Sequence, residues 1–230
     1  MSAMLKFMME NFAHVFPIVA CGAIGLVIML ERSLALIWTY PVSGYENFFE
    51  RIRILVMKDR VPDAIALCDS MREKPVARVV RAGLSRSDQP EHLIEHGLQI
   101  AVSEATDKIN TRTPFLGTIA NVATLFGLLG TIIGLVQSFE AVGAASAAAR
   151  SAMLANGIST AMNATMLGLG AAIPCMIAYS YLNSRAAKLT TLVDQAAVRT
   201  LDLLQQRYYH AAQHDQEPTF HNVVTPRKRA

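Results

Sequence analysis

FGLLGTIIGLVQSF, residues 126–139, places glycines at 127, 130 and 134 and a single threonine, Thr131, in a largely apolar run. Charged residues are absent between Arg112 and Glu140. Because about 20 apolar residues cross a bilayer core of roughly 30 Å, this segment predicts a transmembrane helix. Lipid gives helices little hydrophobic reason to associate, so the glycines indicate a surface where another helix backbone approaches closely.

Two further segments predict membrane spans. Charges are also absent between Arg150 and Arg185, and the stretch NFAHVFPIVACGAIGLVIML, residues 11–30, is uncharged. Apolar residues continue from there to Trp38 and Tyr40, which favour the headgroup region. This run exceeds the roughly 7 to 15 residues of a signal-peptide core, so we expect it to be retained. With 52% hydrophobic and 17% charged residues, the chain is predicted to be an all-α membrane protein with three transmembrane helices.

The distribution of basic residues predicts the orientation. Of 21 lysines and arginines, eleven lie from Arg51 to Arg112 and seven from Arg185 onward, whereas the N-terminal tail carries Lys6 and the short loop carries Arg150. Loops rich in lysine and arginine stay in the cytoplasm. We therefore expect the N-terminus and the short loop to face outward, and the large loop and the C-terminus to be cytoplasmic.

The segments outside the spans show helical periodicity, and no strand is expected. Pro75 suits the first turn of a helix, and Pro114 predicts an interruption before the second span. The expected order is an outward segment (1–12), transmembrane helix 1 (13–40), a cytoplasmic helical domain (41–113), transmembrane helix 2 (114–141), a short outer loop (142–155), transmembrane helix 3 (156–184), a cytoplasmic helix (185–210) and a mobile tail (211–230).

Catalytic and metal-binding patterns are weak in this sequence. HLIEH, residues 92–96, matches the H-x-x-E-H pattern of a zinc peptidase class, but no third ligand is evident, and a solvated helix face is the preferred interpretation. Cys21 and Cys175 fall in spans and Cys68 in the loop, so no oxidised pair is expected. We predict no metal, no cofactor, no enzymatic activity and no nucleic-acid partner.

Polar residues inside the spans are the remaining candidates for a functional site. A hydroxyl stripe is expected on the second span, because its members are spaced by seven residues: Thr124, Thr131 and Ser138, with Asn121 nearby. The third span carries a small-residue stripe and, on another face, two polar residues: Ala161, Thr165, Gly168 and Ala172, then Thr160 and Asn163. The alternative for each threonine is a hydroxyl bonded to its own helix carbonyl.

The sequences GLLGTIIGLVQSF and NGISTAMNATMLGLGAAIPCMIAY together resemble the paired signature of the ExbB, TolQ and MotA family of stator subunits, and the similarity is dense over residues 117–183. The resemblance implies a pentamer in the bacterial inner membrane, with a periplasmic N-terminus and a cytoplasmic C-terminus. Its second and third spans would line a pore around two copies of a single-span partner of the ExbD, TolR or MotB type. The partner would carry an aspartate that takes up and releases protons, and ion flow would deliver work to the cell envelope.

The resemblance also implies roles for individual residues. Thr131 and Thr165 fall on the family's pore threonines, so we expect them in the ion pathway together with Thr124 and Ser138. The expected packing glycines are Gly127, Gly130, Gly134 and Gly168, and the further pore or interface residues are Asn121, Thr160 and Asn163.

One position departs from the family pattern. ExbB and TolQ carry a glutamate where this chain has Thr160, which argues against an ExbB-like or TolQ-like role specifically. MotA-type relatives lack that glutamate. The alternatives from other classes are a passive membrane scaffold and a solute transporter subunit, although transporters more often show two matched halves.

Overall fold

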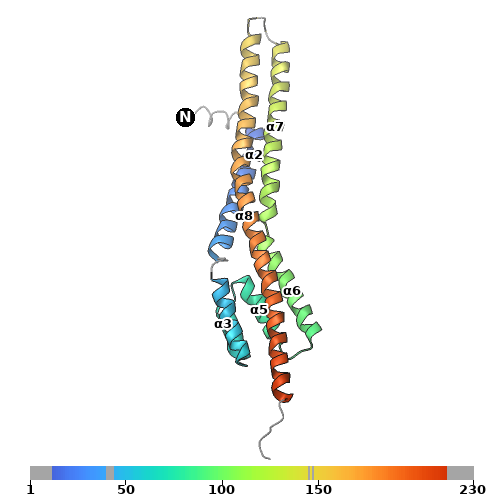
Figure 1. Cartoon of the computed structure of the whole chain (residues 1–230). Helices are drawn as coiled ribbons and strands as arrows, with labels where there is room; N and C mark the ends of the chain where they lie inside the picture. The colour runs from blue at the N-terminus through green and yellow to red at the C-terminus, as the bar shows by residue number, and fades with distance from the viewer. Residues whose placement is uncertain (1–11, 40–43, 145, 147, 217–230) are drawn as a thin grey trace, which may run out of the picture. The chain divides into compact units, whose positions relative to one another are not determined.

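The computed structural model describes residues 12–39, 44–144, 146 and 148–216. Helices account for all regular structure in these ranges, as Figure 1 shows, which confirms the all-α prediction. In chain order they are α2 (Phe12–Ser33), the π-helix η1 (Leu34–Thr39), α3 (Tyr45–Met57), α4 (Val61–Ser70), α5 (Pro75–Leu84), α6 (Glu91–Asn110), α7 (Thr113–Ala144) and α8 (Arg150–Gln216).

Three stretches of the described chain are helical, long and apolar enough to cross a membrane, as predicted. They lie within Val15–Leu36, Glu91–Gly143 and Arg150–His210. The first was expected to be one regular helix over residues 13–40, but Leu34–Thr39 form the π-helix η1. The side chain of Trp38, the residue Tyr40 and the expected outward segment before Phe12 lie outside the described residues.

The chain divides into two compact units, and the membrane-length segments form the first. This unit contains α2, η1, α7 and residues 150–190 of α8. In Figure 1, α7 and the first part of α8 run side by side, with α2 against them. Small side chains dominate the core between the three helices, which is made by Leu116, Ala120, Ala123, Ala172 and Cys175. Small residues allow the close backbone approach on which helix association in lipid depends.

The expected interruption before the second span is present. Helix α6 ends at Asn110, Arg112 has a left-handed backbone with φ of 61°, and α7 begins at Thr113. Pro114 therefore occupies the first turn of α7, where its missing N–H has no intrahelical acceptor to lose. Pro114 therefore determines where α7 begins after the break that follows α6.

Helix α8 is longer than the sequence predicted. It continues without a break to Gln216, although the tail was expected to begin at residue 211. A helix propagates easily once formed, and the alanines and glutamine of HAAQ are good helix formers that need no apolar face to extend it. The remainder of the expected tail, residues 217–230, lies outside the described residues.

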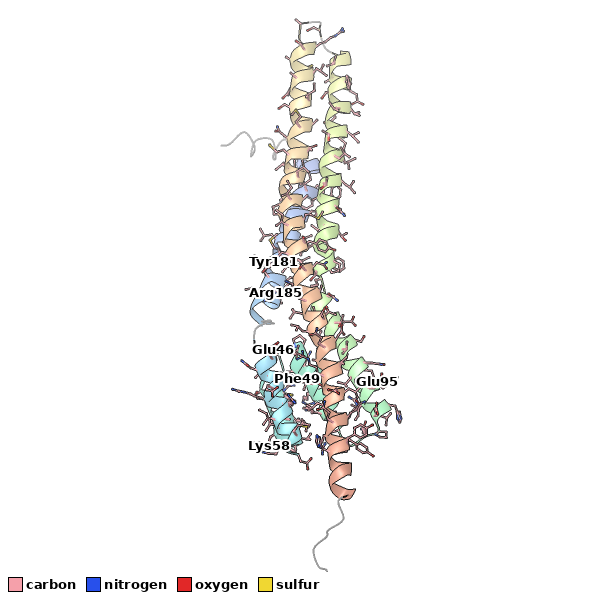
Figure 2. All side chains as sticks on the ribbon, viewed as in Figure 1. Glu46, Phe49, Lys58, Glu95, Tyr181 and Arg185 are labelled. Atoms are coloured by element: carbon pink, nitrogen blue, oxygen red, sulfur yellow. The ribbon has the colours of Figure 1, made fainter. Side chains whose placement is uncertain are left out.

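The second unit contains α3, α4, α5, most of α6 and the end of α8. The guanidinium of Arg199 lies 5.7 Å from the ring centres of both Tyr45 and Phe49, so cation–π contacts join α8 to α3. Figure 2 labels Phe49 and Glu46 on α3, and Lys58 directly after the end of that helix. Cys68 is buried, and burial, followed by the charge of Asp69, raises the pKa of its thiol to about 12 although Arg81 lowers it.

Candidate functional site

The glycines of α7 bring its backbone against the backbone of α8. A methyl group added at Gly168 would lie 2.7 Å from the Cα atom of Gly127 and 2.8 Å from the carbonyl oxygen of Ala123. One added at Gly134 would lie 3.2 Å from the Cα atom of Ala161. Gly168 therefore has no room for a side chain, and Gly134 has room for one only if Ala161 shifts slightly, so the backbones of α7 and α8 lie close together at both positions.

The contact between Gly127 and Gly168 places two threonine hydroxyls together. Thr131 Oγ1 lies 3.0 Å from Thr165 Oγ1, across the interface between α7 and α8. The Thr131 hydroxyl also lies 2.7 Å from the carbonyl oxygen of Leu128 and 3.3 Å from that of Gly127. The Gly127 carbonyl is 3.3 Å from Thr165 Oγ1 as well. Two residues 34 positions apart in the sequence thus form one polar cluster, which we call the hydroxyl pair.

The hydroxyl pair lies at the interface between α7 and α8, and both of its residues are partly exposed.

The other residues of the expected hydroxyl stripe do not join this cluster. Thr124 is exposed and donates to the carbonyl of Ala120 at 3.0 Å. Ser138 is buried and donates to the carbonyl of Gly134 at 2.5 Å, and its side chain fills the space beside Gly157. The three hydroxyls are spaced by seven residues along α7, but they differ in exposure and in hydrogen-bond partners.

The remaining polar candidates are separate from the hydroxyl pair. Asn121 is exposed on α7, and Thr160 and Asn163 are partly exposed on α8. On the helical wheel Asn163 is about 160° from Thr165, and Thr160 is about 140° from it.

The chemistry available at the hydroxyl pair is that of neutral hydrogen bonding. The sequence contains no Asp, Glu, His, Lys or Arg from residue 113 to 139 or from 151 to 184. Threonine hydroxyls donate one hydrogen and accept at two lone pairs, but they do not titrate near neutral pH. The cluster can therefore solvate a charged group brought by another molecule, and it cannot itself carry a proton by ionising.

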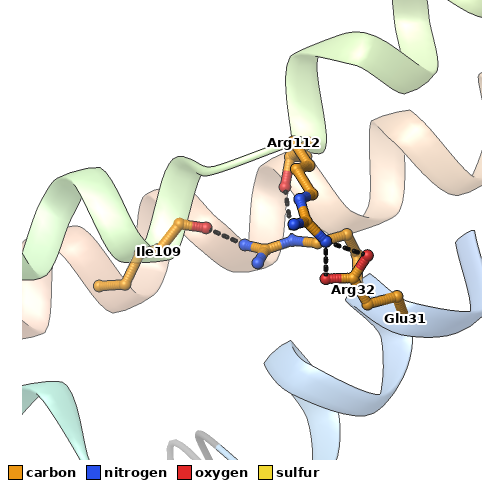
Figure 3. A network of polar contacts seen from close by, with 5 residues as sticks. Glu31, Arg32, Ile109 and Arg112 are labelled. Atoms are coloured by element: carbon orange, nitrogen blue, oxygen red, sulfur yellow. Dashed lines mark hydrogen bonds and ion pairs between the residues drawn. The ribbon is translucent and has the colours of Figure 1, made fainter. Parts of the chain in front are cut away.

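A second polar cluster, which includes Glu31 and Arg32 of α2, lies at the break between α6 and α7. Arg32 is 5% exposed, and its Nη2 donates to the carbonyl of Ile109 while its Nε donates to Thr113 Oγ1 at 3.4 Å. Arg112 binds both carboxylate oxygens of Glu31, at 2.5 and 2.6 Å. Figure 3 shows these contacts joining the end of α2 to the break.

The position of Arg32 has a clear electrostatic reason. The last carbonyls of a helix lack intrahelical partners and carry the negative end of the helix dipole. Ile109 belongs to the last turn of α6, so a buried guanidinium there both satisfies an acceptor and complements the dipole. The sequence could not reveal this contact, because Arg32 and Ile109 are 77 residues apart.

The HLIEH stretch lies on α6 with His92, Glu95 and His96 all exposed, and Figure 2 labels Glu95 on that helix. Within the described ranges, no group of three or more histidine, cysteine, aspartate or glutamate side chains is arranged to hold a metal ion. The arrangement corresponds to a solvated helix face.

Helix α7 and the membrane-length part of α8 lie in a part of the chain that matches a known protein family. Residues 71–195, which include α7 and the membrane part of α8, match the family model described as the MotA/TolQ/ExbB proton channel family. The chain is also 38% identical over 101 residues to the Tol-Pal system protein TolQ of Haemophilus influenzae. That similarity covers 43% of this chain and 44% of the relative. The chain therefore belongs to the MotA/TolQ/ExbB proton channel family.

Proposed function

We propose that this chain is the channel-forming subunit of an ion-driven stator in the bacterial inner membrane. The observation that carries the proposal is the hydroxyl pair, with Thr131 and Thr165 3.0 Å apart and partly exposed on stretches of α7 and α8, residues 113–139 and 151–184, that contain no charged side chain. A relay through hydrocarbon usually needs an ionisable group at depth. The titrating group must then come from another polypeptide.

The partner we propose is a single-span protein of the ExbD, TolR or MotB type that carries an aspartate. Two copies would stand inside a ring of five chains, and the hydroxyl pairs would serve as successive docking points for the aspartate. Proton release and uptake would then turn the ring relative to the partner and deliver work to the envelope. The similarity to a Tol-Pal system protein supports this assignment, while Thr160 in place of the family glutamate distinguishes the chain from typical ExbB and TolQ proteins.

Proton flux through reconstituted protein tests the proposal. The purified chain alone in liposomes should show no steady flux, because its two inner spans contain no titrating carboxylate. Flux measured with an enclosed pH dye should appear when the aspartate-bearing subunit is included, and an Asp→Asn change in that subunit should abolish it. Steady flux from the chain alone would contradict the proposal, and an absence of flux with the partner would favour a passive scaffold.

The proposed orientation makes a separate prediction for thiol labelling in intact cells. Asp88→Cys and Asp215→Cys should resist an impermeant maleimide, whereas Ser146→Cys should react, because basic loops remain cytoplasmic. The native Cys68 gives little background, since the thiolate is the reactive form and burial holds its pKa at about 12. Labelling at 88 without labelling at 146 would reverse the orientation.

A further inference from the structure

The second unit contains a groove whose lining residues lie outside the proposed ion pathway. It has a volume of about 890 Å³ and is formed by the end of α3 with the turn after it, the residues before α6, and residues 204–210 of α8. Val56 and Leu204 in its lining are buried, whereas Met57 and Tyr208 are 41% and 72% exposed. Exposed apolar side chains around a concave surface indicate that the groove binds another segment or molecule.

The charges of the groove favour a basic ligand. Asp59 and Asp88 line it together with Arg207. Arg207 lies 2.8 Å from Asp59, whose side chain remains 79% exposed. Asp88 is exposed and forms no ion pair with any side chain that the structure describes. With His210 neutral, two carboxylates against one guanidinium leave the lining with a net negative charge.

The residues that follow α8 have the matching composition. The segment 217–230, EPTFHNVVTPRKRA, carries Phe220, Val223 and Val224 and then the basic run 227–229. Segments that remain disordered are poor in aromatic and β-branched residues. An apolar group followed by three cations is complementary to an apolar groove with a net negative charge.

This segment starts close enough to the groove to reach it. Helix α8 ends at Gln216, and Pro218 explains this end, because a proline disfavours helical backbone at the residue before it. Residues 204–210 lie about 9 to 18 Å back along the helix axis from Gln216. An extended chain spans at most about 3.3–3.6 Å per residue, so Phe220 reaches up to about 14 Å from Gln216 and Val224 up to about 28 Å.

We infer that residues 217–230 fold back onto this groove of their own chain. The apolar residues 220–224 lie against Met57 and Tyr208, and the basic run lies beside Asp59 and Asp88. A tether this short gives the segment an effective concentration on the order of mM at its own groove, which favours it over a second copy or another protein. The docking does not depend on the proposed function.

Hydrogen exchange of the purified full chain in detergent tests the docking. The amides of residues 220–224 should exchange about tenfold more slowly than their intrinsic rates, because a segment docked about 90% of the time exchanges only from the remainder. Phe220→Ser and Tyr208→Ser should each bring exchange to within about twofold of the intrinsic rates. Asp88→Lys should reduce the protection by about threefold at low salt and by less at high salt, since exposed charges are screened.

Val198→Ser is the control for the loss of an exposed apolar side chain from α8. Val198 is 69% exposed and does not line the groove, so this change should leave the protection as it is in the wild type. Exchange at the intrinsic rates in the wild type would overturn the inference, as would equal effects of Val198→Ser and Tyr208→Ser or no effect of Asp88→Lys. Protection that appears only when phosphatidylglycerol vesicles are added would assign the basic run to a membrane surface and overturn it as well.

Photocrosslinking identifies the chain that supplies the docked segment. A benzoylphenylalanine in place of Tyr208 should crosslink to residues 217–230 and leave the product at the mass of one chain on a denaturing gel. The same group in place of Tyr209, which is 65% exposed but does not line the groove, should give much less of this product. Equal yields at the two positions would reflect the tether alone and overturn the inference. A product at the mass of two chains would make a second copy the occupant and overturn docking within one chain.

Discussion

Replacing Gly168 by valine should prevent α7 and α8 from packing. The first carbon of any side chain there would lie 2.7 Å from the Cα atom of Gly127 and 2.8 Å from the carbonyl oxygen of Ala123. Both obstacles are backbone atoms, which no rotamer change can move aside. Overpacking a helix interface usually costs about 1–3 kcal/mol, and a clash that forces two backbones apart should cost at least the upper end of this range. The hydroxyl pair would be separated as well.

Gly170 provides the matched control for this change. It lies two residues away on the same helix, and a methyl group added there meets nothing within 4 Å. Gly170→Val therefore introduces the same β-branched residue into α8 without the clash. Thermal unfolding in detergent and the yield of monodisperse protein should be near wild type for Gly170→Val and strongly reduced for Gly168→Val. Similar losses in both variants would mean that helix propensity, and not the backbone contact, explains the effect.

Replacing Arg32 by alanine should destabilise the first unit by about 2–3 kcal/mol, the range for buried hydrogen bonds to a charged group. The change leaves the carbonyl of Ile109 and the hydroxyl of the buried Thr113 without the guanidinium that now binds them. Arg32→Lys keeps the charge but loses the geometry that reaches both acceptors at once, so it should recover only part of the loss.

The exposed half of the same network serves as the control. The Arg112 and Glu31 side chains are 56% and 44% exposed, so Arg112→Gln should cost under about 1 kcal/mol. The measurement is the midpoint of denaturation in detergent, compared across the three variants. A loss from Arg112→Gln as large as that from Arg32→Ala would contradict the assignment of the buried guanidinium as the main stabilising contact.

Much of the architecture was predictable because it depends on local chemistry. Charge-free runs of sufficient length predicted the three membrane-length helices, and Pro114 predicted the interruption before α7, since a proline in a helix interior removes a backbone hydrogen bond whereas one in the first turn removes none. The end of α8 was placed too early, because hydrophobic periodicity stops before the helix does. Hydrophobic periodicity shows only where a helix has a buried face, and the helix can continue along the chain after the last buried residue.

The candidate site was only partly predictable. The sequence by itself determined that hydroxyls and small residues would lie along charge-free stretches of two helices, because residue spacing fixes which side chains share a face. Tertiary structure alone decided that Gly127 meets Gly168, that Thr165 bonds across to Thr131 while Ser138 is buried, and that Arg32 binds the end of α6. These contacts join residues 34 to 77 positions apart. Their existence depends on the relative register and rotation of whole helices, which no local pattern of residues encodes.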